Sequence, residues 1–152
     1  MKIKNQILTR SLFSFSLFYS VFSSAQNIEV SDAYIRETLP GNQISSAYMK
    51  ISNNTDHQIT IIGASSSISP KIEIHQHSME NGMMQMRQLE YVNVDAHKNV
   101  LLQPYGLHLM IFNLQQPLKD GQKVQLTLHF AKQDDVIINA PVISIKKKRS
   151  HH

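Results

Sequence analysis

Residues 123–130 read KVQLTLHF, a stretch in which apolar and polar side chains alternate. Leu126, Leu128 and Phe130 take every second position, and the residues between them are polar. A period of two is typical of a β-strand that buries one face and leaves the other in water. This stretch therefore predicts a half-buried strand, with His129 on its solvated face.

Short segments of the same kind recur along the chain, whereas helical periodicity is scarce. The turns between them include Asn81-Gly82, Pro104-Tyr105-Gly106 and Asp120-Gly121. Many short strands separated by such turns are typical of an all-β fold, and we expect an antiparallel β-sandwich or barrel. The other predicted strands lie at residues 28–36, 46–52, 58–64, 71–77, 83–89, 100–103, 107–113 and 136–145.

The first 25 residues have the pattern of an export signal. Lys2, Lys4 and Arg10 precede an apolar run at 11–22, and Ser23-Ser24-Ala25 supplies small residues for cleavage. The run is shorter than the about 20 residues that a membrane-spanning helix needs. We therefore expect a signal peptide at 1–25 and an exported mature chain without stable membrane insertion.

The mature chain has room for one β-domain, which we predict at residues 26–145. Residues 146–152 form a basic tail that lacks apolar periodicity, and we expect it to be flexible. The tail ends in His151 and His152, which could be accessory metal ligands, an ordinary terminus or the remnant of an expression tag.

Composition excludes several classes of protein. The chain has no cysteine, so it offers no lipid-attachment site, disulfide, thiolate nucleophile or zinc–cysteine site. Without the three basic residues of the predicted signal, twelve basic residues remain against eleven acidic ones, which makes a poor nucleic-acid surface. No nucleophile–base pair or phosphate-binding glycine loop stands out, and we do not expect an enzyme.

Two histidines and two methionines stand at spacings that one metal ion could explain. Ten residues separate His75 from Met86, twenty-one separate Met86 from His108, and one separates His108 from Met110. His108 and Met110 share a face of one predicted strand, and a predicted hairpin brings His75 close to Met86. Imidazole and thioether donors suit Cu(I), although Met110 could instead fill a gap in the core.

Neighbouring residues could enlarge this donor set. His77 shares a face with His75 and could ligate, hydrogen-bond or be solvated. Met84 lies on the face of Met86, and either Met84 or Met79 could serve as a further sulfur ligand or as a packing residue. Met83 points to the opposite face, where we expect it to fill the core.

These residues carry a family resemblance. The chain resembles the periplasmic copper chaperones called PCuAC, whose signature of His, ten residues, Met, twenty-one residues, His, one residue and Met is matched without a gap. The resemblance implies a cupredoxin-like β-sandwich that binds Cu(I) in the periplasm through His75, Met86, His108 and Met110. It also implies delivery of copper to the copper centre of cytochrome c oxidase or to its assembly factors. Further matching segments are Ser46-Ala47-Tyr48-Met49, Ile72-Glu73-Ile74-His75, Met79-Glu80-Asn81-Gly82, Met84-Gln85-Met86-Arg87, Gly106-Leu107-His108-Leu109-Met110 and Pro117-Leu118-Lys119-Asp120-Gly121.

Two other functions are compatible with the sequence. The same site could sequester copper in a resistance protein, or the histidines and methionines could merely pack in a β-sandwich interaction module without metal. A blue-copper electron-transfer site is excluded because it needs a cysteine thiolate. We expect a monomer whose partner is a copper-receiving protein.

Overall fold

The structure is a computed structural model that describes residues 27–144. The predicted signal peptide at 1–25 and the predicted tail at 146–152, with His151 and His152, lie outside the described residues. So do both ends of the predicted domain, at 26 and 145.

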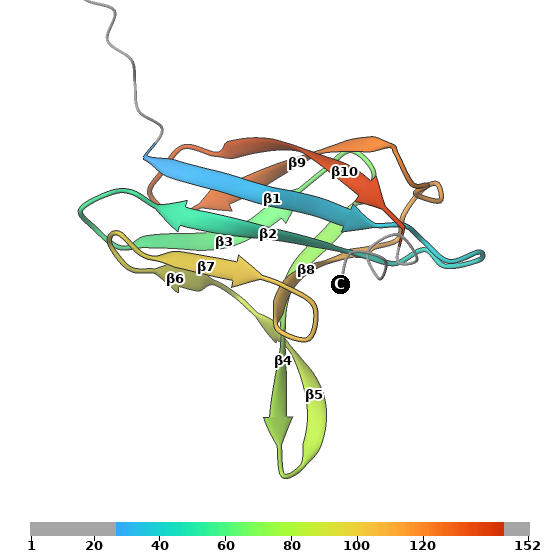
Figure 1. The fold of residues 1–152 in the computed structure, drawn as a ribbon, viewed down its shortest axis with the longest axis horizontal. Coiled ribbons are helices and arrows are strands. Elements are labelled where there is room, and N and C mark those ends of the chain that lie inside the picture. Colours follow the sequence, from blue (N-terminus) through green and yellow to red (C-terminus); the bar gives the residue numbers. More distant parts are fainter. Residues whose placement is uncertain (1–26, 145–152) are drawn as a thin grey trace, which may run out of the picture.

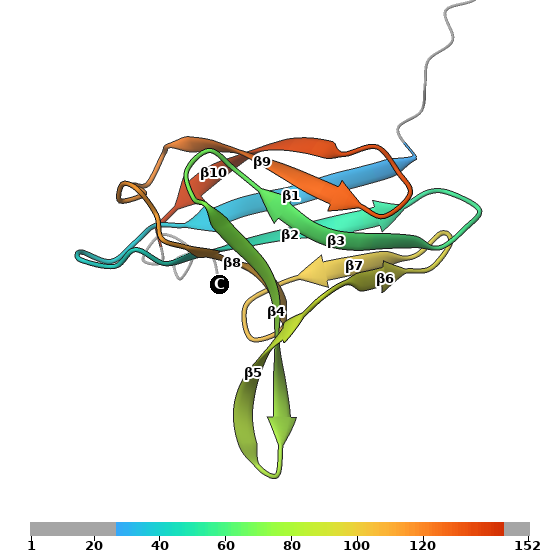
Figure 2. The same cartoon turned by 180° about the vertical axis from the view of Figure 1, so that it is seen from behind.

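The described chain is all-β and folds into a sandwich, as the alternation predicts (Figure 1). The strands pair in the order β5-β4-β8-β7-β2-β1-β10-β9-β3-β6, with a further pairing between β8 and β2. Figures 1 and 2 show β1, β2 and β7 on one side of the molecule and β9, β10 and β3 on the other. The ten strands within residues 27–144 are β1 Ile28–Arg36, β2 Ser45–Asn53, β3 Ile59–Ser65, β4 Lys71–Glu80, β5 Met83–Leu89, β6 Val92–Val94, β7 Asn99–Leu102, β8 Leu107–Phe112, β9 Lys123–Phe130 and β10 Val136–Ile143.

Most strand pairs are antiparallel, as predicted, but two pairings are parallel. β1 runs parallel to β10 over two residue pairs, and β7 runs parallel to β8 at a single pair. The short β1–β10 pairing connects the strands of one layer to those of the other. β6, with only three residues, is the strand that the sequence did not predict.

The core lies between the two layers and consists of the apolar positions of the alternating strands. In β9, Leu126 and Leu128 are fully buried and Phe130 nearly so, as their period of two predicts. Ile74 on β4 and Leu109 on β8 enter the same core and pair directly across the two strands. Burying one such side chain contributes about 1.5–3 kcal/mol, so this pair fixes the register of β4 on β8.

The β4–β5 hairpin projects from the sandwich (Figures 1 and 2). Asn81 and Gly82 form its turn with φ of 52° and 75°, the left-handed conformation that an Asn-Gly hairpin turn requires. Because the hairpin extends beyond the core, its side chains have little to pack against. The prediction that Met83 fills the core is therefore wrong, and this side chain is 63% exposed.

Candidate metal centre

The predicted site residues lie on the outer face of three neighbouring strands, opposite the core. β4 lies between β5 and β8 and pairs with both. His75 is paired directly with His108 across β4 and β8. Met110 is the partner of Glu73 on the same two strands, and Met86 on β5 is the partner of His77 on β4. Directly paired residues of antiparallel strands project to the same side, so this register puts all four predicted residues on one face.

The two methionines stand on opposite sides of the His75–His108 pair. Met110 lies two residues from His108 toward Phe112, and Met86 lies level with His77, toward the hairpin turn. The Met110 sulfur accepts a hydrogen bond of 3.4 Å from the Ser46 hydroxyl on β2 and is half-buried. The Met86 side chain is 49% exposed. The face therefore has a sheltered thioether at one end and an accessible one at the other.

His108 is held in one orientation at the centre of this face. The residue is buried, and its Nδ1–H donates to the Gly106 carbonyl at 2.9 Å. Because a carbonyl only accepts, the proton is on Nδ1 and the lone pair is on Nε2. Burial lowers the pKa of His108 below its ordinary value, against the opposing effect of the Gly106 hydrogen bond. The neutral form, which is the form that binds metals, is thus favoured.

His75 is oriented by a carboxylate on its own strand. Its Nε2 lies 2.8 Å from Oε2 of Glu73, and both side chains are mostly shielded from water. The hydrogen bond from His75, and then that from Lys71, lowers the pKa of Glu73, which favours the ionised acceptor. In the neutral ring, a proton on Nε2 leaves the lone pair on Nδ1, an atom that is buried and has no hydrogen-bond partner among residues 27–144. A carboxylate behind a histidine is a common arrangement at metal sites, where it fixes the ring and raises its basicity.

His77 lies against His108 at the centre of this face. Its ring stacks on that of His108, with centroids 5.0 Å apart and planes at 21°, whereas the His75 and His108 centroids are 6.2 Å apart. Its Nδ1 is also buried without a hydrogen-bond partner in the described part of the chain. The spacing of His75 and His77 predicted the shared face, but the sequence carries no information about the stacking on His108.

Aromatic rings line the same face. The Tyr48 centroid is 6.2 Å from that of His108, and the Phe112 centroid is 5.9 Å from that of His75. Tyr34 packs on Tyr48 at 5.0 Å and extends the row to β1. These rings shield the two imidazoles from water, which makes protonation of His108 unfavourable.

The remaining described histidines lie elsewhere and have other partners. His97 pairs with Asp56, His57 with Gln133, and His129 with Asp135 and Ser65. His129 is partly exposed on its strand, in line with its expected position on the solvated face. Within residues 27–144 no group of three or more histidine or acidic side chains is arranged to hold a metal ion. A metal bound on the β4–β8 face would therefore rely on thioethers as well.

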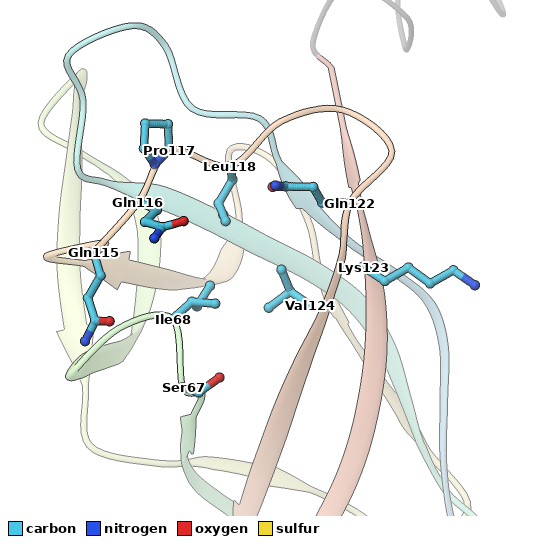
Figure 3. Close-up of a pocket in the computed structure, with 9 residues that line it drawn as sticks. All are labelled: Ser67, Ile68, Gln115, Gln116, Pro117, Leu118, Gln122, Lys123 and Val124. Carbon is cyan, nitrogen blue, oxygen red and sulfur yellow. The ribbon is translucent and has the colours of Figure 1, made fainter.

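A pocket of about 340 Å³ lies apart from these residues, where the loop after β3 meets the loop between β8 and β9 (Figure 3). Ile68, Leu118 and Val124 point into it, and Lys123 points away. No histidine or methionine lines the pocket, so it contains none of the candidate metal ligands on the outer face of β4, β5 and β8. Its walls are formed by Ser67, Ile68, Gln115, Gln116, Pro117, Leu118, Gln122, Lys123 and Val124.

The comparison with known families identifies the chain. The model of the family described as "Putative lipoprotein LpqE-like" matches residues 28–142, nearly all of the described sandwich. The chain belongs to the LpqE-like family. A relative from Leifsonia xyli, "Putative lipoprotein Lxx21020", is 27% identical over 119 residues, which cover 78% of this chain and 70% of that protein.

Solved structures with the same fold are PCuAC domains, which confirms the resemblance seen in the sequence. The copper-bound PCuAC domain from PmoF2 has a TM-score of 0.67 and 21% identity, over 78% of this chain and 93% of that domain. The Cu(I) form of DR1885 from Deinococcus radiodurans has a TM-score of 0.64 and 26% identity, over 80% of this chain and 83% of that chain. This LpqE-like chain therefore has the PCuAC-type β-sandwich.

The family description refers to lipoproteins, which points to a protein outside the cytoplasm. None of the 152 residues here is a cysteine, the residue that bacterial lipoproteins modify. Among residues 27–144 no helix is long and apolar enough to cross a membrane.

Proposed function

We propose that this LpqE-like protein is a periplasmic copper chaperone that binds Cu(I) through His75, Met86, His108 and Met110. The observation that carries the proposal is the pair of oriented imidazoles, His75 and His108, on a face that also carries thioethers. The hydrogen bonds to Glu73 and Gly106 each occupy one ring nitrogen, and the second nitrogen of His75 has no hydrogen-bond partner among residues 27–144. The copper-bound neighbours among solved structures support the choice of metal.

The donor chemistry fits a cargo ion better than a resident cofactor. Thioethers are neutral and soft, so they favour Cu(I) over Cu(II) and hold it less tightly than thiolates do. Glu73 and the Gly106 carbonyl keep the two imidazoles in the required tautomers, so little ordering remains when the ion binds. The exposed thioether of Met86 provides the accessible side of the site, from which a recipient protein could take the ion.

Binding is tested by an anaerobic Cu(I) titration of the chain from Gln26 against a chromophoric chelator. The His108→Ala, Met110→Ala double variant should lose tight one-to-one binding. His97→Ala, which removes an exposed histidine that pairs with Asp56, is the matched control and should bind as the wild type does. Circular dichroism melting checks that the double variant is folded. Equal competition by wild type and double variant would refute the site.

Delivery is tested in cells. We propose that the recipient is the copper centre of cytochrome c oxidase or one of its assembly factors. Deleting the gene should lower oxidase activity when copper is limiting, and added copper or the wild-type gene should restore it. A normal oxidase combined with greater sensitivity to excess copper would instead indicate sequestration.

A further inference from the structure

The β4–β5 hairpin has two chemically different faces. One face is mostly polar and includes an ion pair of 2.5 Å between Glu80 and Arg87, with Met83 beside it. The other face carries a soft donor set of one imidazole and three thioethers: His77, Met79, Met84 and Met86. Alternation along the two strands produces this separation, because residues 77 and 79 share a side of β4 and residues 84 and 86 share the matching side of β5.

The register brings the four donors within reach of one another. His77 is paired directly with Met86, and Met79 is paired directly with Met84. Directly paired residues have Cβ atoms about 4.5–5.5 Å apart, and the two pairs are about 7 Å apart along the strands. A methionine side chain has three rotatable bonds, so its sulfur can turn toward a common point between the pairs.

The soft-donor face of the hairpin has exposed thioethers and a ring nitrogen without a hydrogen-bond partner among the described residues. Met79, Met84 and Met86 are 66%, 55% and 49% exposed, although nothing in the fold requires three long apolar side chains to gather at a projecting tip. Beside them, the buried Nδ1 of His77 has no hydrogen-bond partner among the described residues. An unpaired buried ring nitrogen next to accessible thioethers suits a soft cation.

We propose that His77, Met79, Met84 and Met86 form a second Cu(I)-binding position, through which the ion passes between solvent and the site at His75 and His108. The inference rests on the proposed function, because it takes Cu(I) as the cargo. The stacking of His77 on His108 joins the two positions, and Met86 belongs to both. The ion can therefore move inward by exchanging one ligand at a time, without being released into water.

The test combines Cu(I) titration of the full mature chain with NMR of ¹³C-methyl-labelled methionines under anaerobic conditions. Wild type should bind two equivalents, the second at least tenfold more weakly than the first. The second equivalent should shift the methyl signals of Met79 and Met84 and leave that of Met83 in place. The Met79→Leu, Met84→Leu variant should keep the first equivalent and lose the second, whereas Met83→Leu on the opposite face should keep both.

Other outcomes would overturn the inference in distinguishable ways. If Cu(I) binding saturates at one equivalent, there is no second position. The same holds if the methyl signal of Met83 shifts as much as those of Met79 and Met84. Either result would leave the proposed function intact. Absence of any Cu(I) binding removes both. Transfer of a single bound equivalent to a chelator should be several-fold slower in the Met79→Leu, Met84→Leu variant than in Met83→Leu, and equal rates would refute the passage of the ion through the hairpin.

Discussion

Replacing Glu73 by glutamine should lower the affinity for Cu(I) by about 10–100-fold, or about 1.4–2.7 kcal/mol. The Glu73–His75 distance of 2.8 Å is typical of a hydrogen bond to an ionised acceptor, and the His75 and Glu73 side chains are only 13% and 15% exposed. A neutral amide makes a bond of about half the strength and can also turn its NH₂ group toward the ring, which would favour the wrong tautomer. The substitution also removes the ion pair between Glu73 and the exposed Lys71. This loss should lower the free energy of unfolding by at most about 1 kcal/mol.

The chain contains a matched control for this prediction. His97 Nε2 and Asp56 Oδ1 are also 2.8 Å apart, but the Asp56 side chain is 97% exposed and lies in a turn. Asp56→Asn therefore removes a carboxylate–histidine pair of the same length, and Cu(I) affinity should not change. Both variants are compared with wild type by anaerobic competition with a chromophoric chelator at pH 7.5. If Glu73→Gln and Asp56→Asn bind Cu(I) equally well, Glu73 does not orient a ligand and the role of His75 must be reconsidered.

Three further predictions concern the fold. Leu126→Ala should lower the free energy of unfolding by about 2–5 kcal/mol in urea titrations, because Leu126 is fully buried in the core. Met83→Leu should change that free energy by less than about 0.5 kcal/mol, since the side chain is 63% exposed, and a larger loss would mean that it packs after all. The free energy of unfolding of the metal-free chain should fall as the pH drops below about 6.5, the pKa of an unperturbed histidine. The slope should be at most about 1.4 kcal/mol per pH unit, and the fall should end at the lowered pKa of folded His108. The sign follows because the unfolded chain takes up a proton that folded His108 does not, and His108→Gln should flatten this part of the urea-measured pH profile.

The sequence predicted most strands well because alternation and turn residues are local to each strand. β1, β5 and β9 were predicted to the residue, and the Asn81-Gly82 turn was located from its dipeptide alone. β6 was missed because its three residues, Val92–Val94, are too few to display a period. Met83 was placed in the core because alternation assigns a residue to a face but does not say whether anything covers that face.

The candidate site was predicted less completely. Alternation within β8 put His108 and Met110 on one face, and the structure has them there. The roles of Glu73 and Gly106 were not predicted, because a hydrogen bond to a histidine ring depends on side-chain rotamers and backbone position. The stacking of His77 on His108 was missed for a related reason, since these residues lie on different strands and thirty-one positions apart.

The sequence by itself determined the all-β class, the face on which each side chain lies, and the hairpin at the Asn81-Gly82 turn. These features are local, since they follow from a period of two along each strand and from a two-residue turn. Only the tertiary structure decided that β4 lies between β5 and β8, with His75 level with His108. Neighbours and register between strands distant in the chain are set by burial of shared apolar partners such as Ile74 and Leu109, and a shift by one residue would turn the outer face of β4 into the core.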